Sequence, residues 1–160
     1  MQKRKILFIG LLAIFAIVIA GSASAFDLGF LTGDSGPETV TIEGIDFNIP
    51  EGYKEDENYS YVNETASSGS VKYVMNGKTF ENDKGDAIAI LIADYGKYNV
   101  TEDILKQVAD EKKTINGHDG YVKVDGIFTI FSYIEDGDLV TVTASDESVI
   151  DQVVVSPSFF

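Results

Sequence analysis

The stretch Tyr121–Asp146, YVKVDGIFTIFSYIEDGDLVTVTASD, decides the fold. Apolar and polar residues alternate through it, and two short connections, Asp125-Gly126 and Glu135–Asp138, interrupt the alternation. A period of two is typical of β-strands, and a glycine in a short connection supplies the positive φ that tight hairpin turns need. The stretch therefore predicts three consecutive antiparallel strands joined by hairpins.

Two further segments lie closer to the N-terminus. TVTIEGIDFNIP, residues 39–50, alternates on both sides of Glu43-Gly44 and predicts two short strands, or one bulged strand, ending at Pro50. Residues 51–69 are acidic and polar and predict a surface excursion. Its YSYVNET part, residues 59–65, is equally compatible with an edge strand.

Residues 71–93 predict more of the same sheet. Alternation up to residue 75 is followed by Asn76-Gly77, which predicts a hairpin turn. A second turn is expected at residues 82–85. The run at 87–93 is apolar at every position, so we expect a central strand that helices cover on both faces.

Two segments have the pattern of amphipathic helices. NVTEDILKQVADEKK, residues 99–113, has Thr101 as a candidate cap, and SDESVIDQVVVS, residues 145–156, has Ser145. The valines at 153–155 leave a final strand as the alternative. Together the segments predict an α+β fold, in which an antiparallel β-meander sheet is packed by two helices.

The N-terminus has the pattern of an export signal. Basic residues 3–5 precede an apolar run at 6–20, and Ala23-Ser24-Ala25 matches the small-residue cleavage pattern. We expect a signal helix that is cleaved after Ala25, or else an uncleaved membrane anchor through residues 6–20. The predicted organisation is signal peptide 1–25, flexible spacer 26–39, one α+β domain 40–156 and tail 157–160.

Charge limits the choice of partners. All 26 acidic residues follow Ala25 but only nine of the 12 basic ones do, so residues 26–160 carry a net charge of −17. Nucleic acid and anionic membranes attract basic proteins, so we expect neither as a partner, and membrane contact only through an uncleaved N-terminal segment. The chain has no cysteine, which excludes thiol catalysis and thiolate metal sites.

The single histidine lies in TINGHDGYV, residues 114–122. Asn116-Gly117 and Gly120 beside it supply turn chemistry, so we interpret His118 as a turn residue rather than a catalytic base. No G-x-S-x-G motif accompanies the serines. We therefore predict no catalytic residue, no cofactor and no enzymatic activity.

Acidic clusters make calcium the metal to consider, because calcium prefers oxygen ligands. ENDKGD and EDGD each cluster carboxylates beside a glycine, although an EF-hand register centred on Gly85 fails because Phe80 and Lys84 fall at ligand positions. They are also ordinary turn sequences. The weak calcium candidates are Glu81, Asp83, Asp86, Glu135, Asp136 and Asp138.

Two further kinds of surface residue are candidates. Three Asn-x-Ser/Thr sequons predict N-glycosylation sites on an exported chain, at Asn58, Asn63 and Asn99. Tyrosine is enriched at recognition surfaces, and three tyrosines of the polar excursion are candidates for an exposed contact surface: Tyr53, Tyr59 and Tyr61.

Two stretches carry a resemblance to known domains. GIDFNIPEGY (44–53) resembles the start of PsbP-like domains. INGHDGYV, FTIFSYIEDGDLVTVTAS and VIDQVV resemble the ending shared by that fold and by small exported domains of unknown function of the archaeal type. The resemblance implies an α-β-α sandwich around an antiparallel sheet, and it brings no functional residue with it.

The leader, the acidic surface and the lack of a complete catalytic set together predict an exported binding or interaction module. It would be secreted or held at the cell surface and would bind an unknown partner of the cell envelope or exterior. The alternatives are a small hydrolase that depends on carboxylates and a purely structural surface protein.

Overall fold

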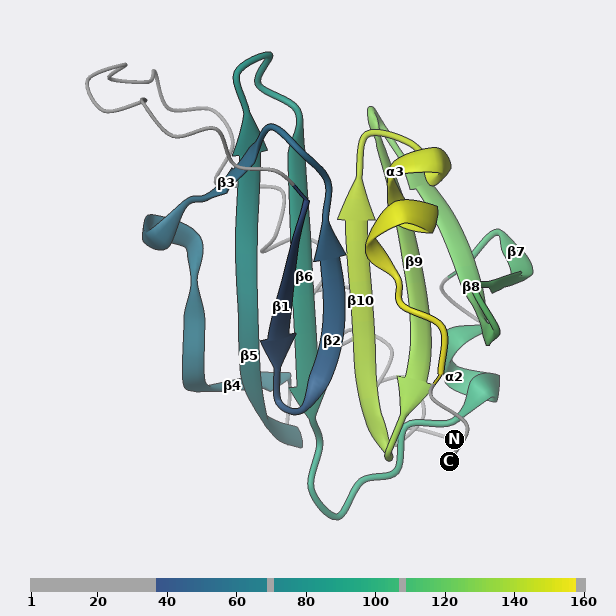
Figure 1. Ribbon diagram of the computed structural model, residues 1–160. Coiled ribbons are helices and arrows are strands. Elements are labelled where there is room, and N and C mark those ends of the chain that lie inside the picture. Colours follow the sequence, from purple (N-terminus) through teal and green to yellow (C-terminus); the bar gives the residue numbers. More distant parts are fainter. Residues whose placement is uncertain (1–36, 69–70, 107–108, 158–160) are drawn as a thin grey trace.

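The structure is a computed structural model that describes residues 37–68, 71–106 and 109–157 (Figure 1). Strands hold 59% of the described residues and helical segments 12%, so the protein is mostly β. The strands are β1 (Glu38–Ile42), β2 (Ile45–Ile49), β3 (Tyr53–Glu55), β4 (Tyr61–Ser68), β5 (Val71–Asn82), β6 (Ala87–Asp94), β7 (Glu111–Ile115), β8 (His118–Asp125), β9 (Phe128–Glu135) and β10 (Asp138–Ala144). The helical segments are η1 (Glu57–Tyr59), α2 (Glu102–Leu105) and α3 (Glu147–Val153).

Eight strands form one antiparallel sheet in the order β3-β5-β6-β10-β9-β8-β7, with β4 also paired to β5. The strands β7 to β10 are consecutive neighbours, which confirms the three-strand stretch predicted from Tyr121–Asp146 and adds β7 to it. After β6 the chain crosses to the far edge of the sheet and returns strand by strand until β10 pairs with β6. The hairpin β1–β2 forms a separate small sheet around Glu43-Gly44, as predicted, and lies in front of β5 and β6 in Figure 1.

The predicted α+β class, with a sheet packed by two substantial helices, is wrong because residues 99–113 do not form one helix. Of the described residues in this segment, Glu102–Leu105 is helical, and Glu111–Ile115 belongs to the edge strand β7. Asn116-Gly117, with φ of 49° and 89°, turns the chain back so that β7 pairs with β8 at five positions. This pairing satisfies the backbone of residues that would otherwise favour a helix, so tertiary context overrides local propensity.

The hairpin predicted at Asn76-Gly77 is also wrong, since both residues lie inside the continuous strand β5. A Cβ atom on Gly77 would lie 2.6 Å from the backbone oxygen of Ile90, so glycine is needed here for close approach of β5 to β6. The Asn76 side chain accepts a hydrogen bond from the backbone N–H of Asn63 in β4. The turn that does join β5 to β6 is the second predicted one, at residues 82–85.

The polar excursion at 51–69 is largely regular. Its residues form β3, η1 and β4. The alternative prediction of an edge strand for residues 59–65 is therefore confirmed for residues 61–65, which belong to β4. Both β3 and β4 pair with β5, so they form the edge of the sheet opposite to β7.

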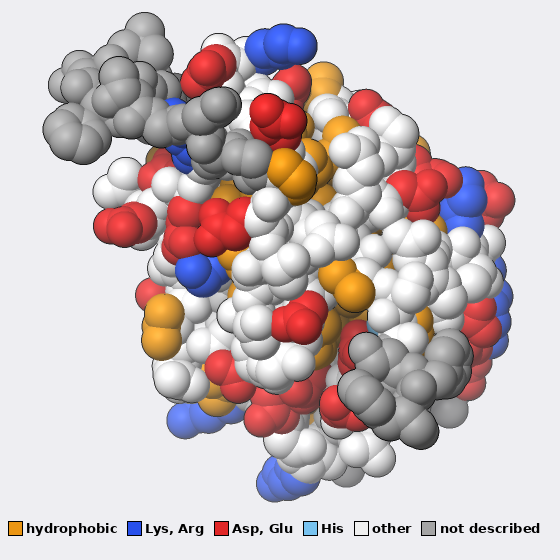
Figure 2. Space-filling view, in the orientation of Figure 1, with side chains coloured by type: hydrophobic (Ala, Val, Ile, Leu, Met, Phe, Trp, Pro, Cys, Tyr) orange, Lys and Arg blue, Asp and Glu red, His pale blue; other side chains and the backbone are white. Residues whose placement is uncertain are grey.

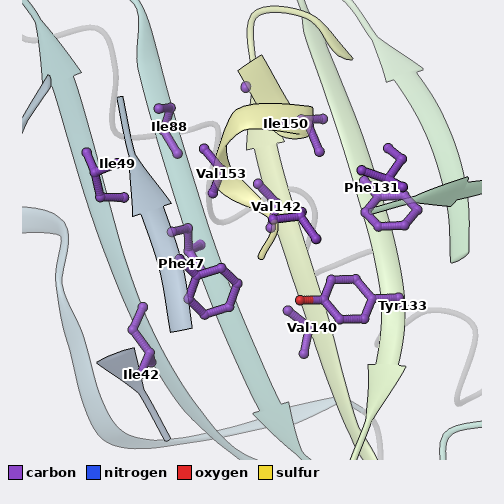
Figure 3. Close-up of a cluster of buried hydrophobic side chains, with 14 of the residues drawn as sticks. Ile42, Phe47, Ile49, Ile88, Phe131, Tyr133, Val140, Val142, Ile150 and Val153 are labelled. Atoms are coloured by element: carbon purple, nitrogen blue, oxygen red, sulfur yellow. The ribbon is translucent and has the colours of Figure 1, made fainter. Parts of the chain in front are cut away.

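The large sheet has an apolar core on each face, and β6 contributes to both. Ile88, Ile90 and Ile92 face the first core, whereas Leu91 and Ala93 face the second. The hairpin β1–β2 and the helix α3 cover the first core (Figure 3), and the connection from β6 to β7, with Tyr95, Val100 and α2, contributes to the second. The expectation that β6 is buried on both faces is confirmed, but a hairpin provides much of the cover that we expected from helices. The buried members of the first core are Ile42, Phe47, Ile49, Phe80, Ile88, Ile90, Ile92, Ile115, Val122, Phe131, Tyr133, Val140, Val142, Ala144, Ile150, Val153 and Val154.

The predicted C-terminal helix is confirmed as α3, although it begins one residue later than the candidate cap suggested. Its cap is Asp146 rather than Ser145, because Asp146 Oδ1 accepts hydrogen bonds from the backbone N–H groups of Ser148 (2.8 Å) and Val149 (3.3 Å). After α3 the chain makes one isolated bridge, between Val154 and Phe47, rather than a full final strand.

The predicted signal helix or anchor, residues 1–25, and the cleavage position after Ala25 lie outside the described residues. Within the part of the chain that the structure describes, no helix has the length and apolar character needed to cross a bilayer.

Candidate functional site

His118 opens β8 directly after the Asn116-Gly117 turn, and its ring is largely buried. Its Nε2 atom lies 2.9 Å from the backbone oxygen of Val155, and because a carbonyl only accepts, Nε2 carries the proton. Its Nδ1 atom faces Glu135 Oε2 at 3.6 Å, and the ring packs on Tyr133 with 4.5 Å between centroids. The histidine therefore holds the segment around Val155 to the sheet.

Two neighbours of His118 contact the same C-terminal segment. The Asn116 Nδ2 group donates to the backbone oxygens of Asp151 (2.6 Å) and Val154 (2.8 Å). Gly117 lies against Pro157, whose Cδ would be 3.1 Å from an added Cβ. The turn prediction is confirmed for Asn116-Gly117 but is wrong for His118 and Gly120, which lie in β8. The structure adds a role that the sequence did not show: residues 116–118 fasten residues 151–157.

A pocket of about 330 Å³ lies between α2 and this turn. Its acidic residues already have partners: Glu102 lies 3.7 Å and 3.5 Å from the ammonium groups of Lys106 and Lys112, and Asp119 Oδ1 accepts a hydrogen bond from Thr114. The arrangement does not resemble two carboxylates held across a cleft for acid–base work. The residues that line the pocket are Glu102, Leu105, Gly117, His118, Asp119 and Ile134.

Among the described residues, Glu135 is a carboxylate with one buried oxygen that lacks a hydrogen-bond partner. This oxygen is Oε2, and the Nδ1 atom of His118 lies 3.6 Å from it. Burial raises the pKa of the Tyr133 hydroxyl, and the charge of Glu135 contributes to this shift. Glu135 thus places negative charge at the margin of the first core.

Carboxylates gather at the same end of the sheet, and we call this group the acidic end: Glu43, Asp94, Asp136 and Asp138. They come from the β1–β2 turn, the end of β6, the β9–β10 turn and the start of β10. Burial raises the pKa of Asp138, and the charges of Asp94, Glu43 and Asp136 raise it further, so these three groups lie close enough to act on Asp138. Figure 2 shows acidic side chains in the lower part of this face.

No ion pair among the described residues includes a member of the acidic end. Sequence reasoning found Asp136 and Asp138 but missed Glu43 and Asp94, because they lie more than 40 residues away along the chain. The available signal was their position at strand ends, which an antiparallel sheet brings to one edge.

The calcium candidates do not converge on a shared site. In residues 37–157, apart from the two gaps, no three acidic or histidine side chains are placed to hold one metal ion. Glu81, Asp83 and Asp86 lie at the β5–β6 turn, where Asn82 Nδ2 donates to Asp86 Oδ2 and Asn82 Oδ1 accepts from two backbone N–H groups. Burial raises the pKa of Glu81, with a further contribution from Asp56. Glu135, Asp136 and Asp138 lie at the opposite end of the sheet.

The three candidate contact tyrosines do not form one surface. Tyr53 packs against the first core and Tyr61 against the second, on opposite faces of the sheet, and each is half-buried. Tyr59 is also half-buried and lies close enough to Tyr61 to affect its pKa. The large apolar side chains that are exposed in the described residues are scattered: Val62 lies in β4, Tyr98 lies after β6, Val124 lies in β8, and Ile127 lies in the β8–β9 turn.

No protein-family model matches the chain, and neither a curated protein nor a solved structure shows significant similarity to it. The resemblance to PsbP-like domains therefore stays a prediction from a few stretches of sequence, whereas the α-β-α sandwich that it implied is wrong for this mostly β protein.

Proposed function

We propose that the protein is an exported interaction module that uses the acidic end to bind a basic segment of a partner in the cell envelope or exterior. The observation that carries the proposal is the gathering of Glu43, Asp94, Asp136 and Asp138 from four segments without a cation in ion-pair contact among the described residues. Like charges held together are unfavourable in the free protein, and a cationic partner relieves this repulsion.

Two further features support binding rather than catalysis. The Nε2 atom of the only histidine is engaged with the backbone oxygen of Val155, and its Nδ1 atom faces Glu135 Oε2 at 3.6 Å, so neither ring nitrogen is directed at a hydroxyl nucleophile. Glu43, Asp94 and Asp136 are close enough to Asp138 to act on its pKa, but the four carboxylates are not placed to share one metal ion. Several separated charges suit lysine and arginine side chains on another chain better than a single bound ion.

The test compares two variants of equal net charge. Asp136→Asn/Asp138→Asn neutralises half of the acidic end and retains a residue that tolerates the positive φ of 51° at position 136. Glu38→Gln/Glu64→Gln removes the same number of charges from exposed positions in β1 and β4 and serves as the matched control. Affinity for a synthetic lysine- and arginine-rich peptide is measured by titration calorimetry at several salt concentrations, with and without calcium.

We expect the first variant to bind the basic peptide roughly two- to thirty-fold more weakly, because each of the two lost contacts between charges is worth about 0.2–1 kcal/mol. The control variant should bind nearly as well as the wild type. Equal losses in the two variants would show that only net charge matters and would refute a specific site. Tight calcium binding that depends on Asp136 and Asp138 would favour a metal site instead.

A further inference from the structure

The three sequon asparagines all have exposed side chains, but the structure places them in different surroundings. Asn58 lies in η1, Asn63 lies in β4, and Asn99 lies in the connection between β6 and α2. An N-glycan is joined to the amide nitrogen Nδ2, and the hydroxyl two residues later is part of the acceptor signal. The state of these two groups therefore separates the sites.

At the first sequon both groups are engaged. The Asn58 Nδ2 group donates to Asp56 Oδ1 at 2.9 Å, and the backbone N–H of Asn58 donates to the same oxygen at 3.0 Å. The hydroxyl of Ser60 donates to Glu55 Oε1 at 3.0 Å. A transferase would have to break these bonds before it could use Asn58 in the folded protein.

The second sequon is presented by an irregularity in β4. The pairing with β5 shifts between Tyr61 and Glu64, Asn63 has a φ of 50°, and its backbone N–H donates to Asn76 Oδ1 at 2.7 Å. The backbone is thus fixed. The side chains of Asn63 and Thr65 are exposed and make no hydrogen bond in the described part of the chain.

The third sequon is equally accessible. Asn99 is exposed, whereas Val100 beside it is buried and anchors the connection. Thr101 stands at the cap position of α2, yet its hydroxyl makes no capping hydrogen bond. Both acceptor groups are therefore available.

We propose that Asn63 and Asn99 are N-glycosylation sites of the folded protein and that Asp56 holds Asn58 back. The donor is an oligosaccharide on a polyprenyl phosphate or diphosphate carrier. The bond between Nδ2 and the anomeric carbon forms, and the bond from that carbon to the carrier oxygen breaks. The carrier leaves with the electron pair, and the amide proton passes to a base of the transferase. The inference rests on the proposed export but not on the basic partner.

A glycan on Asn63 would also cover an edge of the sheet. β4 is eight residues long and pairs with β5 alone, so its other side has no strand partner among the described residues. Unpaired edges recruit strands from other molecules, and bulges and bulky groups oppose this. The glycan would extend from the bulge at the middle of this edge.

The experiment expresses the full chain, with its own leader, in a secretory host cell that has an oligosaccharyltransferase. Site occupancy is measured by glycopeptide mass spectrometry for the wild type and for Thr65→Ala, Thr101→Ala and Asp56→Ala. Thr65→Ala removes the second acceptor signal and keeps Asn63, whose conformation the bulge requires. Asp56→Ala removes the group that holds the Asn58 amide.

We expect occupancy at Asn63 and Asn99 to exceed that at Asn58 by at least about five-fold, the factor that corresponds to one net hydrogen bond. Asp56→Ala should raise Asn58 occupancy, and Thr65→Ala should abolish modification at Asn63 alone and increase self-association measured by light scattering. Equal occupancy at all three sites, or exported protein without glycan, would overturn the proposal. Chain retained inside the cell with its leader would instead overturn the proposed export.

Discussion

Substitution of Gly120 by alanine tests the packing of β8 on β9. An added Cβ would lie 2.5 Å and 2.7 Å from two ring atoms of Phe131 and 2.6 Å from the backbone oxygen of Ser132. Phe131 is fully buried in the first core, and the backbone oxygen belongs to a strand paired on both sides, so neither neighbour can move freely. Overpacking costs about 1–3 kcal/mol, and we expect about 3 kcal/mol here, because both contacts are shorter than real Cβ contacts.

The assay is urea denaturation followed by circular dichroism. With an m-value of about 1.5–2 kcal/mol/M, the Gly120→Ala midpoint should fall by roughly 1.5–2 M. Gly126→Ala is the control, since no atom lies within 4 Å of its added Cβ and its only cost is a φ of +62°, about 1 kcal/mol.

A second change isolates the ring contact. If Phe131 causes the clash, Phe131→Leu should reduce the cost of Gly120→Ala by about 1 kcal/mol in a double-mutant cycle. A Gly120→Ala protein within about 0.5 kcal/mol of the wild type, or strictly additive effects, would refute the reasoning.

Three other substitutions follow from the same structure. Asn116→Gly keeps the turn but removes two hydrogen bonds to the C-terminal segment, so the free energy of unfolding should fall by about 1–2 kcal/mol. Amide hydrogen exchange at residues 154–155 should accelerate, and unchanged exchange there would contradict the role of Asn116 in fastening this segment. Asp146→Ala should cost about 1 kcal/mol at pH 7. Hydrogen bonds, above all from Ser148, lower the pKa of Asp146, so the stability difference between this variant and the wild type should vanish as the pH falls through that lowered value. Urea denaturation at pH 7 and in strong acid measures the difference, and a difference that persists in acid would contradict the capping role of the carboxylate. Asp138→Asn should change stability in the opposite direction. Burial and acidic neighbours raise the pKa of Asp138, so the wild type loses stability as the pH rises through that raised value. The variant should therefore be more stable than the wild type at pH 7 but not in acid, as measured by thermal unfolding at both pH values.

The two Asn-Gly pairs show what local sequence can and cannot predict. Asn116-Gly117 is a hairpin turn, whereas Asn76-Gly77 runs through the middle of a strand. The first pair adopts the positive φ values that the dipeptide favours. The second uses the same residues for other properties: the missing side chain of Gly77 admits β6, and the amide of Asn76 holds the β4 bulge. Only the neighbouring strands distinguish the two.

Hairpins with short connections were predictable because their turn chemistry lies within a few residues. The strand at Glu111–Ile115, inside the segment 99–113 that we predicted as a helix, was not predictable. The spacing of apolar and charged residues that indicated a helix also suits a strand once β8 supplies a partner. The acidic end was predictable in half: Asp136 and Asp138 are neighbours in sequence, while Glu43 and Asp94 join them only through the sheet topology.

The pairing of β6 with β10 has a consequence for the order of folding. Its five residue pairs join positions 46 to 54 residues apart, from Ala93 with Leu139 to Ala89 with Thr143, whereas the neighbouring hairpins close over short loops. Closing a long loop costs more chain entropy, so the β6–β10 pairing should form late in folding, after the hairpins on each side of it have begun to form. Substitutions that weaken the β6–β10 pairing would then increase the unfolding rate far more than they decrease the refolding rate.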